Sequence, residues 1–341
     1  MEEFTDVFLM VLLIVGTLGV LYVNNLFVAT MLLGAVSLIM ALIFVNLDAV
    51  DVAFTEAAVG AGISTVLYLG TLALVGANEK PRGKRSPIPL LASLLVGGIL
   101  AYATLDLPKI GSVDTPVQMS EVTERYVYTS PEEIGVPNMV TSVLASYRGF
   151  DTFGEVTVIF TAGIAVLLIL RQLHRRREDE ETPGNPPFQK VKAEGSPHDL
   201  VPHVVAKLLI PFILLFGLYV QFHGDFGPGG GFQAGVIFAA GFILYSLVFG
   251  LDNLKKLIPV HFVEIILAAG VLIYGGVGVV SMLKGANFLD YNILSADPIA
   301  GQHLGILIIE IGVGVTVTAA MLCIFYGFAG RSDELEKNNG E

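Results

Sequence analysis

The feature that most constrains this chain is a series of apolar stretches, each of which is long enough to cross a lipid bilayer. A transmembrane helix needs about 20 consecutive, largely apolar residues. Nine segments meet this requirement: 5–24, 26–45, 51–76, 88–105, 153–173, 204–222, 231–250, 259–283 and 300–328. The last segment is long enough to tilt in the bilayer or to protrude from it. The sequence therefore predicts an all-α fold, a polytopic integral membrane bundle of about nine transmembrane helices.

The composition is that of a membrane protein rather than of a soluble domain. Of the 341 residues, 54% are hydrophobic and 15% are charged, and the mean hydropathy is +0.73. Soluble domains are about 45–50% apolar and about 25% charged. The net charge is −12 and the basic residues form only one short arginine cluster, 175–177, so we expect no nucleic-acid partner. The acidic start of the chain, Met1-Glu2-Glu3, predicts no cleavable signal peptide.

The residue types and their spacing argue against a disulfide, a metal site and a bound cofactor. The single cysteine, Cys323, excludes an intrachain disulfide and a Cys-based metal site. The run 229–234 formally matches the dinucleotide fingerprint G-x-G-x-x-A. That fingerprint requires a preceding strand in a βαβ unit, whereas a predicted membrane span precedes the run here. We therefore expect no cofactor, no metal and no catalytic residue, and we do not expect an enzyme.

The basic residues predict the orientation of the chain in the membrane. If the N-terminus lies outside, the inner segments hold 15 of the 19 Lys and Arg residues. The outer segments then hold only Lys109, Arg125, Arg148 and Lys284. Cytoplasmic loops carry an excess of basic residues, so the sequence predicts an outer N-terminus, an inner C-terminus and an odd number of spans.

Two polar linkers suggest how the chain is divided. The linker 78–86 is short and basic, whereas 174–202 is charged, rich in proline and too poor in apolar residues to pack. The predicted division is a three-helix membrane module (1–80), a two-helix membrane module with an outer loop (86–173), a cytoplasmic linker (174–202), a four-helix membrane domain (203–330) and a tail (331–341). Within the polar outer segment 106–150, residues 138–147 fit a short amphipathic helix on the membrane surface.

Ionisable residues inside spans are rare, and they usually face protein or water. Glu56 lies about five residues into the third span, about 7–8 Å deep at 1.5 Å per residue. Gly60 and Ser64 follow it at helical spacing and give it a small, polar stripe. Glu56 is therefore a candidate for an ion or proton path. The alternative is a buried carboxylate that hydrogen-bonds a neighbouring helix.

The last span holds a second candidate pair. Glu310 lies near its middle, and His303 lies seven residues earlier on nearly the same face. Because histidine titrates near neutral pH, the two side chains would suit a proton relay, about 10 Å long at 1.5 Å per residue, with a bridging water. The alternative places His303 at a wet interface on a protruding helix. His261 and Glu264 form a similar pair, for which a structural role is favoured.

The remaining candidates lie near the ends of spans. Asp151 and Glu155 follow Arg148 at helical spacing, and the same stretch also fits an ion pair with a capping box, Thr152 to Glu155, that opens the fifth span. In the sixth span, Pro211 frees the backbone carbonyl of Lys207, which would line a hydrated path or simply mark a kink. The side chains of His223 and Asp225 stand in a turn of Gly and Pro residues, where they would gather protons or cations.

Several motifs resemble one family of transport proteins. The stretches 51–64 and 138–155 resemble the C-terminal part of the large A subunit of Mrp-type (Mnh-type) multisubunit Na⁺/H⁺ antiporters, in modules similar to the proteins MbhD and MbhE of membrane-bound hydrogenase. Residues from about 200 to 330 resemble the B subunit (MnhB or MrpB) of the antiporters. This last resemblance rests on the motifs 227–235, 287–291, 301–305 and 310–314.

The resemblance implies a subunit of an assembly that exchanges Na⁺ for H⁺ across the plasma membrane of a prokaryote. Its implied partners are the other antiporter subunits, Na⁺, H⁺ and membrane lipids. The same modules occur in membrane-bound hydrogenases and related complex-I-like respiratory assemblies, so a cation-translocating subunit of such a complex is the alternative. A purely structural membrane scaffold is a third interpretation. The chain departs from the usual layout because it joins A-tail and B modules and lacks the long antiporter-core helices of the A subunit.

Overall fold

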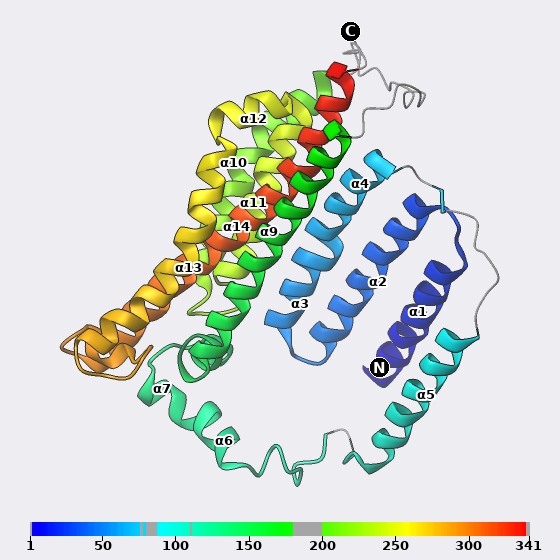
Figure 1. Ribbon diagram of the computed structural model, residues 1–341. Helices are drawn as coiled ribbons and strands as arrows, with labels where there is room; N and C mark the ends of the chain where they lie inside the picture. Colours follow the sequence, from blue (N-terminus) through cyan, green and yellow to red (C-terminus); the bar gives the residue numbers. More distant parts are fainter. Residues whose placement is uncertain (1, 76–77, 80–86, 110, 180–199, 339–341) are drawn as a thin grey trace.

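The structure, a computed structural model, describes residues 2–75, 78–79, 87–109, 111–179 and 200–338. Within this part the chain is helical and holds no strand (Figure 1). The α-helices are α1 (Glu2–Tyr22), α2 (Leu26–Asn46), α3 (Val50–Glu56), α4 (Ser64–Val75), α5 (Ile88–Ala103), α6 (Glu121–Glu124), α7 (Ser130–Glu133), α8 (Met139–Thr141), α9 (Gly149–Asp179), α10 (Leu200–His223), α11 (Gly231–Phe249), α12 (Leu251–Leu257), α13 (Val260–Leu283) and α14 (Pro298–Asn338).

Shorter turns of other helix types interrupt or join these helices. Three are π-helical: η1 (Ala57–Ile63), η3 (Arg125–Thr129) and η4 (Ser142–Tyr147); two are 3₁₀-helical: η2 (Thr104–Asp106) and η6 (Tyr291–Leu294). The segment η1 joins α3 to α4, so the third apolar stretch crosses as one helix with a π-helical middle. Such π segments inside longer helices are often found at functional sites.

The prediction of nine membrane spans is confirmed. In the described part of the chain, nine helices are long and apolar enough to cross a membrane: Phe4–Tyr22, Leu26–Asn46, Val50–Leu72, Ile88–Asp106, Gly149–Leu170, Val201–His223, Gly231–Phe249, Val260–Leu283 and Pro298–Ala329. Their orientation, with the N-terminus outside, stays a prediction from the basic residues. The linker residues 80–86 and 180–199 lie outside the described residues, and α9 continues to Asp179, beyond the predicted start of the second linker.

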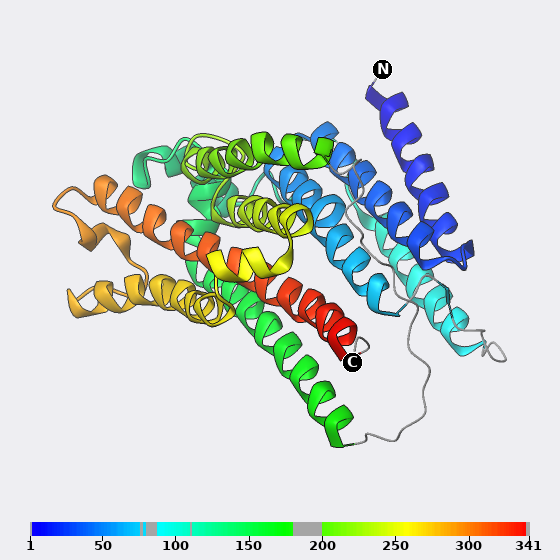
Figure 2. The same ribbon diagram turned by 90° about the horizontal axis from the view of Figure 1, so that it is seen from above.

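The helices gather around α14, which packs along α9, α11 and α13 (Figures 1 and 2). Glycines allow this close approach: a side chain at Gly231 of α11 would overlap with the backbone of Glu310, and one at Gly270 of α13 would overlap with Thr316. Small residues at such contacts let membrane helices pack backbone against backbone. α14 is therefore the most buried span, with 61% of its apolar window buried.

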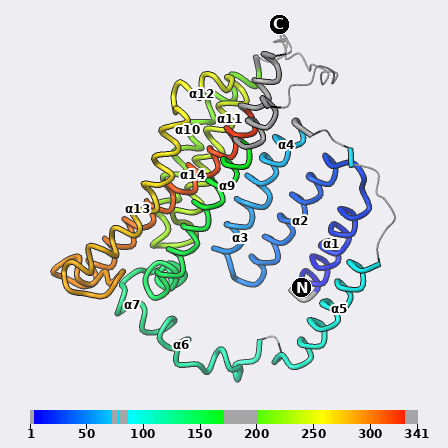
Figure 3. Tube along the Cα trace, in the orientation of Figure 1, coloured from blue at the N-terminus to red at the C-terminus, as the bar shows by residue number. Residues whose placement is uncertain are grey.

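The first three spans form a layer beside this bundle. α1 packs on α2, and α2 packs on α3, η1 and α4. Contacts of α3 and η1 with α11, and of α4 with α14, join the layer to the bundle. By contrast, all residues of α5 are exposed, and in Figures 1 and 3 the chain returns from α5 to α9 through an outer segment that arcs along one end of the molecule.

The outer segment differs from the sequence prediction in one respect. A short helix does form over 138–147, as α8 and η4, but it does not lie free on a surface. Ser142 and Ala145 are buried in the protein, and the hydroxyl of Thr141 donates to the carbonyl of Gly224, 2.7 Å away. The buried face of this helix thus satisfies backbone groups of a distant loop, while Met139 and Leu144 stay exposed, and its place on the membrane surface stays a prediction.

The start of α9 also differs from the prediction. The helix begins at Gly149, three residues before the proposed capping residue Thr152, whose hydroxyl donates to the carbonyl of Leu144 instead. Gly149 is buried against the hydroxyls of Tyr274 and Tyr291, and Tyr274 donates to its carbonyl at 2.7 Å. This tertiary contact sets the first turn, so the local capping pattern was misleading.

Candidate functional site

A glycine-rich loop, residues 224–230, joins α10 to α11 at the end of the bundle where the outer segment runs. The loop folds back on α10: the amide of Gly227 donates to the carbonyl of His223 at 3.1 Å, and the amide of Gly230 donates to the carbonyl of Val220 at 3.0 Å. Gly230 has φ of +114°, a conformation that side chains rarely adopt. This folding turns the amides of Gly229 and Gly231 toward other elements.

Two carboxylates from distant parts of the chain accept these amides. Oδ1 of Asp51, at the start of α3, accepts from the amide of Gly229 at 3.2 Å. Oε2 of Glu310, in the middle of the α14 span, accepts from the amide of Gly231. Backbone N–H groups stabilise a carboxylate, so the loop supports both acidic groups within apolar surroundings.

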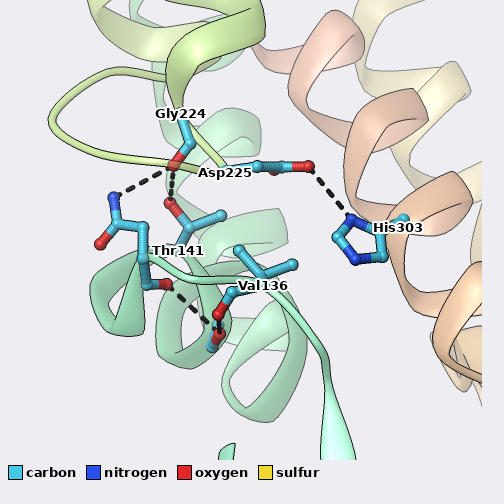
Figure 4. Close-up of polar contacts among 7 residues, drawn as sticks. Val136, Thr141, Gly224, Asp225 and His303 are labelled. Carbon is cyan, nitrogen blue, oxygen red and sulfur yellow. Dashed lines mark hydrogen bonds and ion pairs between the residues drawn. The ribbon is translucent and has the colours of Figure 1, made fainter. Parts of the chain in front are cut away.

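The loop itself supplies a third carboxylate. Oδ2 of Asp225 lies 3.4 Å from Nδ1 of His303, which α14 carries two turns before Glu310 (Figure 4). The charges of Asp225 and Asp51 both act on Glu310. We name these three residues, Asp51, Asp225 and Glu310, the carboxylate cluster.

The chemistry of the carboxylate cluster is that of ion binding and release. A charged group in apolar surroundings is costly, and a proton or a cation offsets this cost. The negative charges of Asp51 and Asp225 act on Glu310, so positive charge bound among them would be favoured. In the described part of the chain, no group of three or more His, Cys, Asp or Glu side chains converges closely enough to hold a metal ion.

Glu56 lies apart from the carboxylate cluster. It is partly buried at the junction of α3 and η1, and a side chain at Gly60 would lie 2.6 Å from its Oε1. Ser37 of α2 contacts the same position. Thr55, the residue before it, accepts a hydrogen bond from Gln233 of α11 at 2.9 Å. Gly60, the first residue of the predicted stripe, thus lies beside Glu56 and faces α2.

The other candidates also lie outside the carboxylate cluster. Asp151 forms the predicted ion pair with Arg148, and both side chains are exposed; Glu155 is exposed one turn further along α9. His261 and Glu264 form the predicted pair, with Nδ1 and Oε2 3.9 Å apart.

Lys207 and His223 both belong to α10. The side chain of Lys207 is exposed, one turn before Pro211, which stays inside the helix. His223 ends α10 at the start of the glycine-rich loop, where its ring stacks on Tyr219. Among the predicted residues, the structure therefore brings Asp225, His303 and Glu310 together, with His223 next to them along the chain.

The proposed relay between His303 and Glu310 looks different in the structure. Among the described residues, the imidazole pairs with Asp225, whereas Glu310 binds the amide of Gly231. His303 thus contacts the carboxylate cluster through Asp225, and it does not pair with Glu310 directly. Asp51 was not predicted as a site residue, although it lies only five residues before Glu56 and opens the same motif.

An ordered set of polar side chains lies beside the carboxylate cluster, in the outer segment. Tyr147 donates to Oε2 of Glu133 at 2.6 Å, and Nε of Arg125 donates to the same oxygen at 3.0 Å. The hydrogen bonds from Tyr147 and Arg125 lower the pKa of Glu133, and burial raises the pKa of Tyr147 to about 12. These groups line a cavity of about 620 Å³ that Gln302, the neighbour of His303, also lines.

Three family models match successive parts of this chain. They describe the D component of a complex abbreviated MBH over residues 11–77, the E component of MBH over residues 92–186, and a domain related to the MnhB subunit of a Na⁺/H⁺ antiporter over residues 201–323. The carboxylate cluster draws on the first and the third of these regions.

Known proteins show the same likeness. A probable K⁺/H⁺ antiporter protein of Rhizobium meliloti, described as its A/B subunit, is 25% identical over 326 residues, which cover 88% of this chain and 32% of that protein. The putative antiporter protein mnhB2 of Staphylococcus aureus is 36% identical over 134 residues, which cover 36% of this chain and 94% of that protein. A chain in the structure of the Mrp complex from Dietzia sp. DQ12-45-1b superposes with a TM-score of 0.75 and 26% identity; the match covers 94% of this chain and 34% of that one. This chain thus spans about a third of the longer relatives.

Proposed function

Because the chain belongs to the family of MnhB-related subunits of Na⁺/H⁺ antiporters, we propose that it is one component of an assembly that exchanges a monovalent cation for protons. The nine apolar helices of the described residues make it a multi-pass protein of a prokaryotic plasma membrane. Its relatives indicate a transporter component and not an enzyme. The carboxylate cluster is proposed as its contribution to the ion path.

One observation carries this proposal: Asp51, Asp225 and Glu310 come from three distant parts of the sequence and meet at one glycine-rich loop. Buried acidic groups that merely stabilise a fold are usually paired with a basic side chain. Among the described residues, the basic side chain that pairs with the cluster is that of His303, through Asp225. Carboxylates that lack a fixed cationic partner can bind a proton or a cation, as an antiporter requires.

The partners follow from the lengths of the relatives. The similar K⁺/H⁺ antiporter protein and the similar chain of the Mrp complex are each about three times as long as the matched region. We propose that this chain works together with the antiporter-core helices that the remaining two thirds of such relatives would supply, in one assembly. Both Na⁺ and K⁺ occur in the descriptions of its relatives, so the proposed substrate class is a monovalent cation together with H⁺.

A second candidate rests on the matches to the D and E components of MBH, which cover residues 11–77 and 92–186. In this alternative the chain belongs to the cation-translocating membrane arm of a hydrogenase-type complex, and redox chemistry takes place in its partners. Purification with native partners separates the two candidates. An antiporter moves cations in vesicles when only a pH gradient is imposed, whereas a redox-driven complex also needs an electron donor.

The proposed ion path is tested with Asp225→Asn, which keeps the shape of the side chain and removes its charge. Asp252→Asn is a matched control, because Asp252 is exposed on α12, outside the predicted spans. Cation-dependent proton movement in vesicles is measured per assembled complex. A loss of at least about tenfold, or about 1.4 kcal/mol, is expected for Asp225→Asn and none for Asp252→Asn. Equal activity of both variants would remove Asp225 from the path.

A further inference from the structure

Asn138 occupies a buried position at the centre of the site, although it carries no charge. It is 8% exposed and lies immediately before α8. Its Oδ1 accepts from the amide of Val140 at 3.0 Å, which caps this helix. Its own backbone amide donates to the carbonyl of Asp225 at 2.9 Å. The main chain of Asn138 is thus tied directly to the glycine-rich loop.

The amide nitrogen of the side chain makes the more specific contacts. Nδ2 lies 3.0 Å from the carbonyl oxygens of both Gly224 and Gly227, and 3.4 Å from Oδ2 of Asp51. These are three acceptors and no donors, so the contacts require N–H groups on residue 138. An aspartate would present only acceptors to them, and a serine would be too short to reach all three.

These contacts place Asn138 between the loop and the carboxylate cluster. Asp51 is held from two sides, by Nδ2 of Asn138 and by the amide of Gly229. Gly229 follows directly on the stretch that Asn138 clamps, and Gly231, two residues later, donates to Glu310. A shift of the loop relative to α8 would therefore change the surroundings of all three carboxylates together.

From this geometry we infer that Asn138 is a positioning residue, which sets the loop and Asp51 so that the carboxylate cluster binds its ion. The inference rests on the proposed function of that cluster. The contacts of Asn138 also connect the three matched regions, because Asp51, Asn138 and Gly224 each lie in a different one.

The test separates the helix cap from the amide donors. Asn138→Ser keeps an oxygen that can cap α8 but lacks the Nδ2 donors. Thr141→Val is the matched control, because it removes the neighbouring bond to the carbonyl of Gly224 and leaves Asp51 untouched (Figure 4). In each variant the maximal rate of cation-dependent proton transport and the half-saturating cation concentration are measured in vesicles that hold the full complex, and the rate is normalised to assembled complex.

Asn138→Ser is expected to raise the half-saturating concentration about tenfold, since unsatisfied buried partners weaken the site, and to leave the maximal rate within about twofold. For Thr141→Val we expect a rise of less than about threefold. Asn138→Asp keeps the size of the side chain and the helix cap, but it presents only acceptors to the three acceptors. We expect the ratio of maximal rate to half-saturating concentration to fall at least as much as in Asn138→Ser.

Two outcomes would overturn the inference. In the first, Asn138→Ser and Asn138→Asp reduce the amount of assembled complex, and the remaining complex keeps the half-saturating concentration of the wild type. Complete failure of both variants to assemble would overturn the inference as well. The other is equal behaviour of Asn138→Ser and Thr141→Val. If Asp225→Asn and Glu310→Gln lower transport while the Asn138 variants do not, only the positioning role fails. If Asp225→Asn and Glu310→Gln are themselves without effect, the proposed function fails.

Discussion

Glu310 and Glu56 are both carboxylates within membrane-spanning helices, yet their surroundings differ. Glu310 contacts the glycine-rich loop, and the charges of Asp51 and Asp225 act on it. Glu56 lies against Gly60 of its own span and near Ser37 of the adjacent span, and within the described structure it makes no hydrogen bond or ion pair. An acidic residue inside a span thus identifies a candidate, but its role depends on which distant segments meet there.

The two regions also differ in how far along the chain their contacts reach. The bond between Asn138 and Asp51 joins positions 87 residues apart, and the bond between Gly229 and Asp51 joins positions 178 residues apart. Glu56, by contrast, lies against Gly60, four residues further along its own span. We therefore place the main ion path at the carboxylate cluster and give Glu56 a secondary part in it.

The largest effect is expected for Glu310→Gln. Glutamine retains an oxygen that can accept from the amide of Gly231, but it cannot take up or release a proton. Transport per assembled complex should fall at least about 100-fold, or about 2.7 kcal/mol in the barrier. Vesicle assays of proton movement with quantified complex measure this directly. A rate within about twofold of the wild type would make Glu310 a structural residue and remove the basis of the comparison.

A smaller effect is expected for Glu56→Gln, which makes the comparison quantitative. We expect transport per assembled complex to fall about tenfold, or about 1.4 kcal/mol, because Glu56 lies outside the carboxylate cluster. Growth at high Na⁺ or alkaline pH should weaken correspondingly. If Glu56→Gln abolishes transport while Glu310→Gln retains it, the order of the two regions is reversed.

The third prediction concerns pH and His303. Histidine changes its charge near neutral pH, and its partner Asp225 belongs to the carboxylate cluster. His303→Gln should therefore flatten the pH dependence of transport between about pH 6 and 8, with rates that differ from the wild type about threefold or more on the acid side. The rate is measured across pH at fixed cation concentration. A pH profile parallel to that of the wild type would exclude the imidazole from the path.

The smallest effect is expected when the chain is cut between the matched regions that end at residue 186 and begin at residue 201. The halves should still associate, because Tyr274 and Tyr291 of the second half bind the carbonyls of Gly149 and Ala145 in the first. Co-expressed halves with one affinity tag should co-purify, with transport within about threefold of the intact chain, a loss of about 0.7 kcal/mol or less. Two stable halves that do not associate would show that the contacts of Tyr274 and Tyr291 do not hold the two halves together.

The sequence predicted the spans more reliably than the site, for a physical reason. A membrane span is a local property of about 20 residues, and all nine predicted segments correspond to helices of the described part. Asp225, His303 and Glu310 were identified because ionisable groups near or within spans are rare. Asp51 and Asn138 were not identified as site residues, because only the packing of distant segments gives them their partners.

Asp51→Asn tests the central claim most directly, because only the meeting of distant segments assigns a role to Asp51. The variant keeps the acceptor for the amide of Gly229 and removes the charge. The measurement is cation-dependent proton transport in vesicles, per assembled complex, beside the exposed control Asp252→Asn. The account predicts a loss of at least about tenfold, or about 1.4 kcal/mol, in normally assembled complex. Wild-type transport by Asp51→Asn would contradict it and would show that the three carboxylates do not share one ion path.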